Sequence, residues 1–432
     1  MKKLILGLGL VVLFAGSAAA VSSDMGGFVY WNLANPTSGA YSVQQLYKLE
    51  LDTAWDTVGS KENFDNVDHN NTYTSWNNWQ KRHSLEVLDP RHLGGQGDLL
   101  QFVINTPDSP PNTESSHNKP WDIIKVGSQT TICDGRNYTT SSNWDTRHMG
   151  VALAAPEDWV PGTSSNGLSL IAVAGIWGED IMYLHDQNNN GAIDNTLSEG
   201  VMLHRGSTGC SDVEFADDGT LFMSTAGYHK PFDIRRMWVD ADGGFHNQRY
   251  YNVGTYWSPW LDNALNPMGG ATDGFGIAVG PSQSAPVVYV FALDNDTGRP
   301  AIWALKDGDG DNAIHWLDPD DTFAKVWDDG EHNVDVYNGN YGGEDLEYYE
   351  NPENGAKFLF GNSYYNKLFV LELADNGLLA VDGKMITTSQ GPGGYNDGFE
   401  LDLNPVPEPT TWLLLGTGVL GLFGYVRRRR MK

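Results

Sequence analysis

Short runs of alternating apolar and polar residues recur along the chain, and alternation of this kind predicts half-buried β-strands. Most of the runs begin at an acidic residue, and their starts lie 52 to 72 residues apart. No segment keeps the 3.6-residue spacing of an amphipathic helix, and the abundant glycine, tryptophan and tyrosine favour strands and turns. The six runs are 84–90, 148–156, 212–219, 273–280, 345–350 and 397–403.

Further strands follow each of the first five runs. After a turn comes a second, more apolar run, then a third, and usually a fourth, more polar strand such as 248–253 or 323–327. Four antiparallel strands repeated about six times predict a β-propeller, in which the sheets stand as blades around an axis. The second runs are 99–105, 168–178, 221–227, 287–293 and 358–364, and the third runs are 121–126, 181–185, 236–239, 302–306 and 368–373.

The two ends of this body complement each other. The last run, 397–403, has no strands after it, whereas 27–33 and 45–51 form strands with no inner strand before them. We therefore predict an all-β, six-bladed β-propeller, a single domain over residues 21–404 whose last blade is closed by N- and C-terminal strands. Closure removes open sheet edges, which invite aggregation. A pair of β-sandwiches with coincidental spacing is the alternative.

Two of the predicted inner strands carry a family resemblance. The segments 212–223 and 273–279 resemble inner-strand units of NHL-repeat and gluconolactonase-like β-propellers. The resemblance covers about four blades and implies a fold rather than an activity.

The first twenty residues have the three zones of a secretory signal peptide. Lys2 and Lys3 form a basic start, residues 4–15 form an apolar run, and residues 18–20 are small alanines. This order predicts a signal helix over residues 1–20 that signal peptidase removes near Ala20. A buried N-terminal helix is the alternative.

The last 28 residues, 405–432, have an equally distinct order. A proline-rich segment, 405–409, stops regular structure, because proline fixes φ and lacks an N–H donor. An uncharged apolar run, 411–426, follows, and four arginines come directly after it. This run predicts a short transmembrane helix whose basic end stays in the cytoplasm.

The same tail resembles the PEP-CTERM sorting signal, in the order Val-Pro-Glu-Pro at 406–409, apolar segment and basic end. The resemblance implies a Gram-negative host that makes exopolysaccharide. It also implies that an exosortase cuts the tail near Pro407, Glu408 and Pro409. An ordinary single-pass membrane anchor is the alternative.

The net charge of the body, residues 21–404, limits the classes of partner that it can bind. The chain has 27 basic and 55 acidic residues, a net charge of −28. Without the seven basic residues and one acid of the two ends, 20 basic and 54 acidic residues remain. Such a surface repels nucleic acid and suits an extracellular protein that binds divalent cations.

The two cysteines, Cys133 and Cys210, can form at most one disulfide within the chain. An exported protein meets an oxidising compartment, and the predicted blades place both residues in loops of neighbouring blades. Two unpaired buried thiols are the alternative.

Two loops carry oxygen side chains at the spacing of a calcium loop. Each follows the third strand of a blade, and the first resembles EF-hand and dockerin-type loops as far as its ninth position. Calcium takes six to eight oxygen ligands, so we predict structural calcium in both loops. Leu197 replaces the glutamate at position 12 of the first loop, and a polar hairpin without metal is the alternative. The predicted ligands are Asp186, Asn188, Asn190 and Asp194, and then Asp307, Asp309, Asp311 and Asp318.

The acidic residues at the starts of the inner strands form a second candidate site, because equivalent positions of a propeller converge on its central channel. Convergent carboxylates hold a metal or raise one another's pKa values. In gluconolactonase-like enzymes a channel metal supports lactone hydrolysis, and the resemblance places such a metal here. Capping of tight turns by these side chains is the alternative. The predicted ring comprises His148, Asp212, Asp273, Glu344, Asp345 and Asp397.

These features favour a non-enzymatic protein of the cell surface or exopolysaccharide matrix. It would reach the inner membrane, remain anchored there until exosortase acts, and then bind polymer or surface proteins through its loops. Clustered aromatic residues, among them Tyr250 and Tyr251, either stack on sugars or pack between blades. No nucleophile elbow, P-loop or zinc-protease motif occurs. The alternative is an exported metal-dependent propeller enzyme, a lactonase-like hydrolase or a quinone-dependent sugar dehydrogenase.

Overall fold

A computed structural model of the chain shows an all-β protein. The predicted signal helix, 1–20, and the predicted transmembrane segment, 411–426, lie outside the residues that it describes. Within the described part of the chain, no helix has the length and apolar character needed to cross a membrane. The structure describes residues 25–34, 44–67, 85–87, 99–104, 121–125, 130–134, 150–154, 169–174, 180–188, 190–193, 199–204, 209–216, 218–226, 231–255, 268–269, 276–280, 286–315, 317–337, 343–351, 354–363, 367–387 and 396–402.

The described strands follow one another with a single short 3-10 helix among them. The first twelve are β1 (Met25–Ala34), β2 (Gln44–Asp52), β3 (Thr57–Val67), β4 (Leu85–Val87), β5 (Leu99–Ile104), β6 (Trp121–Lys125), β7 (Thr130–Asp134), β8 (Gly150–Ala154), β9 (Ser169–Ala174), β10 (Asp180–His185), β11 (Gly200–His204) and β12 (Gly209–Phe215). The others are β13 (Leu221–Ala226), β14 (Pro231–Val239), β15 (Phe245–Thr255), β16 (Met268–Gly269), β17 (Gly276–Gly280), β18 (Val287–Asp294), β19 (Pro300–Lys306), β20 (Thr322–Asp328), η5 (Glu331–Asn333), β21 (Gly343–Glu350), β22 (Lys357–Ser363), β23 (Lys367–Leu373), β24 (Ala380–Thr387) and β25 (Asn396–Asp402).

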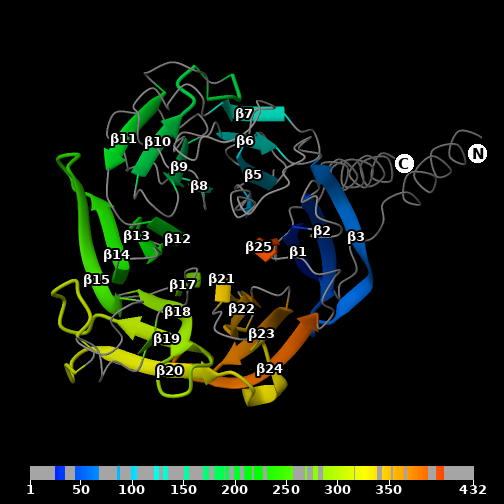
Figure 1. The fold of residues 1–432 in the computed structure, drawn as a ribbon, viewed down its shortest axis with the longest axis vertical. Helices are drawn as coiled ribbons and strands as arrows, with labels where there is room; N and C mark the ends of the chain where they lie inside the picture. The colour runs from blue at the N-terminus through cyan, green and yellow to red at the C-terminus, as the bar shows by residue number, and fades with distance from the viewer. Residues whose placement is uncertain are drawn as a thin grey trace, which may run out of the picture.

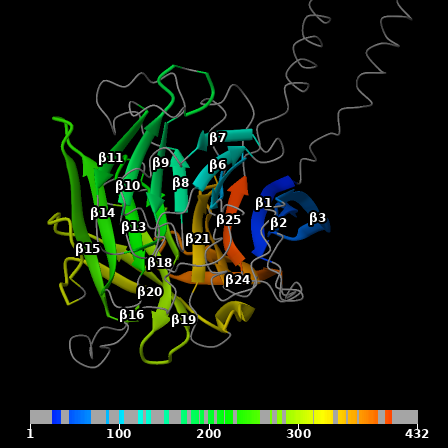
Figure 2. The same ribbon diagram turned by 45° about the horizontal axis from the view of Figure 1, so that its top comes forward.

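The described strands pair into antiparallel sheets that resemble propeller blades and stand around a common axis (Figure 1). Four consecutive strands make up most sheets, and the sheet of β17 to β20 adds the short strand β16 beside β18. The innermost strands contact one another in turn around the axis, in the order β25, β4, β8, β12, β17, β21 and again β25. Figure 2 shows β21 and β25 running side by side at the centre. The predicted repeat of four-stranded antiparallel units is confirmed, and the sandwich alternative does not describe this arrangement.

One sheet contains both ends of the described chain. Its order is β25-β1-β2-β3, and β25 pairs antiparallel with β1, with Phe28 opposite Asp402 and Tyr30 opposite Glu400. The last strand therefore supplies the inner edge of a sheet whose outer strands come first in sequence, as the two ends predict.

The core lies between neighbouring sheets, because successive side chains of a strand point to opposite faces. In β18, Val290 belongs to a buried cluster with Phe222 of the preceding sheet. Its neighbour Phe291 packs edge to face on Phe369 of the following sheet, with ring centroids 5.5 Å apart. Each such fully buried side chain stabilises the fold by roughly 1.5–3 kcal/mol. A strand buried on both faces thus fastens its sheet to both neighbours.

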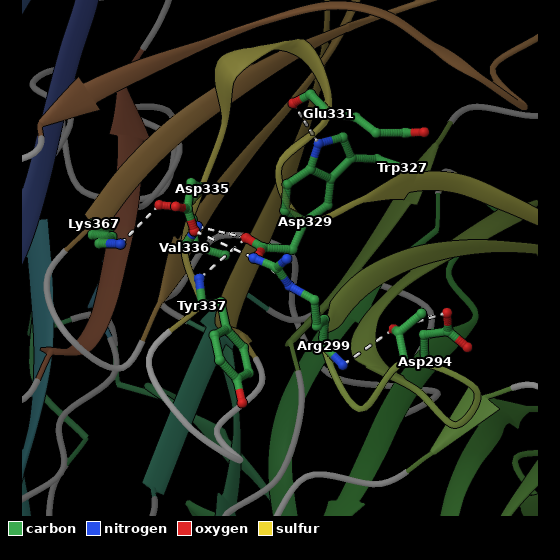
Figure 3. Close-up of polar contacts among 10 residues, drawn as sticks. Asp294, Arg299, Trp327, Asp329, Glu331, Asp335, Val336, Tyr337 and Lys367 are labelled. Carbon is green, nitrogen blue, oxygen red and sulfur yellow. Dashed lines mark hydrogen bonds and ion pairs between the residues drawn. The ribbon is translucent and has the colours of Figure 1, made fainter.

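A buried carboxylate holds the connection between β20 and β21 (Figure 3). The Asp329 side chain has no exposed surface and accepts hydrogen bonds from the backbone N–H groups of Val336, at 2.6 Å, and Tyr337, at 3.1 Å. Arg299 donates to the same carboxylate through Nε at 3.1 Å and Nη2 at 2.6 Å, and it lies over the Tyr337 ring. The connection is therefore fixed to the β18–β19 turn by charge-assisted hydrogen bonds.

Candidate metal centre

The loop between β19 and β20 begins at Asp307, directly after the buried strand β19. The Asp307 carboxylate accepts hydrogen bonds from the N–H groups of Gly310, at 2.6 Å, and Asn312, at 2.8 Å. Both donors have positive φ, 82° at Gly310 and 68° at Asn312, a conformation that glycine and asparagine adopt most readily. The sequence thus folds the loop tightly around its first carboxylate.

Three carboxylates converge in this loop. Oxygen atoms of Asp307, Asp309 and Asp321 lie within 4.8 Å of one another. Asp321 comes directly before β20, and its two oxygens accept hydrogen bonds from the N–H groups of Gly308, at 3.1 Å, and His315, at 2.7 Å. Asp307 is buried, Asp321 is partly buried and Asp309 is exposed.

The convergence has an electrostatic cost that a cation would remove. Two like charges at this separation repel by about 1 kcal/mol in water and by about 3 kcal/mol near a protein surface. Among the described residues, no lysine, arginine or histidine forms an ion pair with Asp307, Asp309 or Asp321. Carboxylate oxygens are the ligands that calcium prefers, so the group is suited to bind a divalent cation.

Of the four ligands predicted in this loop, Asp307 and Asp309 belong to the converging group, and the other two do not. Asp311 instead accepts a hydrogen bond from the N–H of Ala313, at 2.8 Å, and its other oxygen lies 3.3 Å from Nε2 of His315. Asp318 accepts a hydrogen bond from the N–H of Asp320, at 2.9 Å, which closes its own turn. Sequence reasoning missed Asp321, although its place directly before the fourth strand was the available signal.

The loop between β10 and β11 has the same beginning. Asp186 follows β10 and is 2% exposed, and its oxygens accept hydrogen bonds from the N–H groups of Asn190, at 3.2 Å, and Gly191, at 2.8 Å. Asn188 donates through Nδ2 to Oε1 of Glu199, at 3.4 Å. Glu199 stands directly before β11 and was not predicted, whereas the predicted ligand Asp194 lies outside the described residues.

Among the inner strands, Asp212 forms a link to the next sheet. Its Oδ2 accepts a hydrogen bond from the N–H of Ile277 in β17, at 2.7 Å, and its Oδ1 accepts one from Val213, at 2.9 Å. Asp345 likewise accepts a hydrogen bond from the N–H of the following residue, Leu346, at 2.8 Å. Both aspartates follow a β-bulge and bind nearby backbone N–H groups, which is the capping alternative.

Three acids of the inner strands also influence one another. Asp212 and Glu214 are both partly buried, and packing of the inner strands removes much of the hydration of their carboxylates. This loss of hydration, increased by the charge of Asp345, raises the pKa of Asp212 well above its usual range. The same two causes raise the pKa of Glu214 to about 8. Glu214 was not predicted, because its burial depends on how the inner strands pack.

The rest of the predicted ring is described only in part. His148 and Asp273 lie outside the described residues, and Glu344 and Asp397 belong to β21 and β25 without described side chains. Among the side chains that the structure describes, only Asp307, Asp309 and Asp321 form an acidic group within metal-binding reach. The channel ring stays a prediction.

The cysteines lie in sheets with another sheet between them. Cys133 is buried in the outer strand β7, and Cys210 belongs to the inner strand β12. The sequence analysis predicted both cysteines in loops of neighbouring blades, whereas the structure places both in strands. Their pairing stays a prediction.

The aromatic residues Tyr250 and Tyr251 are both 2% exposed and belong to the core between two sheets. Packing between blades, rather than contact with sugars, is therefore their role in the described structure.

Comparison with known proteins identifies one short part of the sequence. Residues 405–430 match the PEP-CTERM protein-sorting motif, which implies export and exosortase-mediated sorting to the cell surface. No curated protein matches the chain.

Several solved structures resemble the body at low identity. A lectin from Aleuria aurantia, in complex with α-methyl-L-fucoside, is 11% identical over 85% of this chain and 96% of its own, with a TM-score of 0.41. Another structure of that lectin is described as a six-bladed β-propeller. An α-L-arabinofuranosidase from Fusarium graminearum, in complex with an iminosugar inhibitor, is 10% identical over 73% of this chain and 82% of its own, also with a TM-score of 0.41. The sugars and inhibitors are those of the other proteins.

Proposed function

We propose that the chain is a six-bladed propeller protein of the cell surface or exopolysaccharide matrix of a Gram-negative bacterium, with a binding or structural role. The signal peptide directs export, residues 411–426 anchor the chain in the inner membrane, and exosortase cuts near Pro407, Glu408 and Pro409. The observation that carries this proposal is the sorting motif at 405–430, which begins three residues after the closing strand β25.

The body supports a scaffold or a binding module. Its strands are held by cores between sheets, and its strongly acidic surface suits an extracellular protein that binds cations. The converging carboxylates of the β19–β20 loop support structural calcium. Loops on a rigid ring can present contacts to a polymer or a partner protein.

Sorting is tested by expressing the full chain in a bacterium that has an exosortase. The chain should appear at the cell surface in a form shortened at its C-terminus. Replacing Glu408 and both flanking prolines by alanine should leave the uncut chain in the inner membrane, as should deletion of the exosortase. A wild-type chain that stays uncut, or an altered chain that is cut normally, would contradict the proposal.

The binding role is tested with the shortened protein recovered from these cells. It should co-sediment with exopolysaccharide purified from the same strain and not with an unrelated neutral glucan. Absence of co-sedimentation and of surface-protein partners would argue against binding. Turnover of lactones or oxidation of sugars by the same sample would favour the enzymatic alternative.

A further inference from the structure

A buried carboxylate of Glu199 has one oxygen without a partner. Glu199 is 3% exposed, and its Oε1 accepts the hydrogen bond from Asn188 that directs the carboxylate to the β10–β11 loop. Its Oε2 is buried and has no hydrogen-bond partner among the described residues. Buried ionised oxygens are normally paired or bound to a metal. This atom therefore indicates a positively charged ligand beside Asp186 and Asn188.

The two loops place their carboxylates at equivalent positions. Asp186 and Asp307 come directly after the third strand of their sheets, and Glu199 and Asp321 come directly before the fourth. Because third and fourth strands pair antiparallel, the residues that flank the loop are brought together at one end of the sheet. The converging group of the second loop shows the result: its flanking carboxylates lie within 4.8 Å.

Strand register therefore selects the last ligand in place of a count along the loop. Glu199 stands 13 residues after Asp186, and Asp321 stands 14 residues after Asp307. Both exceed the spacing of a 12-residue calcium loop, so counting leads to Leu197 and Asp318 instead. The fourth strand begins one residue beyond Glu199 and Asp321 in either case.

Each loop is also fastened to the preceding sheet by one buried isoleucine. The N–H of Ile193 donates to the carbonyl of Ile132 in β7, at 2.7 Å, and the N–H of Ile314 donates to the carbonyl of Tyr250 in β15, at 2.7 Å. β7 and β15 are the outermost strands of their sheets. Both isoleucines are buried, and each belongs to the stretch between the two flanking carboxylates.

The second loop makes further contacts with that neighbouring sheet. The N–H of Asp307 donates to the Tyr250 hydroxyl at 3.2 Å, so the first carboxylate of the loop is itself tied to β15. Arg236 of β14 donates through Nη1 to Oδ1 of Asn312, and Gln248 of β15 donates to the Asn312 carbonyl at 3.4 Å. The loop conformation and the docking of the two sheets are thus linked.

We propose that Glu199 and Asp321 complete two equivalent calcium sites, and that each bound ion fastens its sheet to the outer strand of the preceding sheet. The sites deepen the calcium part of the proposed function, on which this inference rests, and are independent of sorting. Asp186, Asn188 and Glu199 supply oxygen ligands in the first site, and Asp307, Asp309 and Asp321 supply them in the second. A bound ion holds the two flanking carboxylates together and thereby maintains the isoleucine hydrogen bond to the neighbouring sheet.

Calcium binding is measured by titration calorimetry on the processed protein recovered from cells, with calcium chloride as the probe. The wild-type protein should bind one ion for each loop. Glu199→Gln and Asp321→Asn should each lose one ion, whereas the control Asp318→Asn, at the position reached by counting, should lose none. Retention of both ions by Glu199→Gln and Asp321→Asn would overturn the ligand assignment.

Folding of the variant provides a further check. Glutamine matches glutamate in size and removes the buried charge, so calcium-free Glu199→Gln should melt at or above the temperature of calcium-free wild type. The wild type should gain more thermal stability from calcium than the variant. The role of Glu199 would be overturned if the calcium-free variant melted below calcium-free wild type and if calcium raised the melting temperature of the variant by as much as that of the wild type.

The fastening of the sheets is measured separately by hydrogen exchange of peptides that contain Ile193 or Ile314. Removal of calcium with a chelator should speed exchange of both amides by about tenfold or more, because the loops open. Normal calcium binding with unchanged exchange would overturn the fastening and leave the ion sites standing. Absence of any calcium binding would overturn both, together with the calcium part of the proposed function, but not sorting.

Discussion

Replacement of Asp329 by alanine tests how the connection between β20 and β21 is held. The change removes four hydrogen-bond contacts at once, two from backbone N–H groups and two from Arg299. The buried N–H of Val336 loses its acceptor, which costs about 1–3 kcal/mol. The N–H of Tyr337 is partly accessible to water, so its loss costs about 1 kcal/mol. The Arg299 side chain is 44% exposed, so its pairing contributes about 1 kcal/mol or less.

The expected loss in the free energy of unfolding is therefore about 2–5 kcal/mol for Asp329→Ala. Asp329→Asn keeps an oxygen for the two N–H groups and should cost about 1–2 kcal/mol. Urea denaturation followed by tryptophan fluorescence measures both. Asp335→Asn is the matched control, because Asp335 is 67% exposed and 3.8 Å from Arg299, and it should cost less than about 1 kcal/mol. The reasoning fails if Asp329→Ala costs no more than the control, or if Asp329→Asn costs as much as Asp329→Ala.

Three further changes test other parts of the molecule. The pKa of Glu214 is about 8 in the folded protein, above the usual 4.5, so the free energy of unfolding should fall as pH rises from about 4.5 through 8. Glu214→Gln should flatten this dependence in thermal melts at pH 5 and pH 9, and equal slopes in both proteins would contradict it. Gly308→Ala would place a methyl carbon against the Asp320 carbonyl oxygen, so it should lower the melting temperature and weaken calcium binding. An unchanged calcium titration would refute the second effect. Tyr289→Phe removes the hydrogen bond to the Gly377 carbonyl, at 3.0 Å, and should cost about 1 kcal/mol in urea denaturation; no cost would show that water replaces it.

Much of the architecture follows from local patterns. The apolar run 287–293 predicts a strand, and the buried residues of β18 indeed face both neighbouring sheets. The pairing of β25 with β1 is predicted because one end has an inner strand in excess and the other lacks one. Such predictions need only the period of the side chains and the number of strands in each repeat.

The candidate site is less accessible to sequence reasoning. Asp307 and Asp309 are found because they are close in sequence, whereas Asp321 and Glu199 reach the loops through strand pairing. Glu214 is missed for a similar reason, since its pKa depends first on its burial among the inner strands and then on the charge of Asp345 in another sheet. In the sequence, nothing distinguishes Asp329 from the other acidic residues that follow strands. Only the folded connection brings it to Val336 and Arg299.

The position of β25 has a consequence for the order of events outside the cytoplasm. Phe28 and its partner Asp402 are 374 positions apart, so this pairing is available only after nearly the whole body has crossed the membrane. A chain cut short before Asn396 would leave the inner edge of β1 without a partner and open to other strands. Glu408 follows Asp402 by six residues, which reach about 20 Å at most when extended. A protease that cuts this close to β25 needs space beside the closing sheet. Cleavage would therefore be coupled to the pairing of β25 with β1, and release from the membrane would mark a closed propeller.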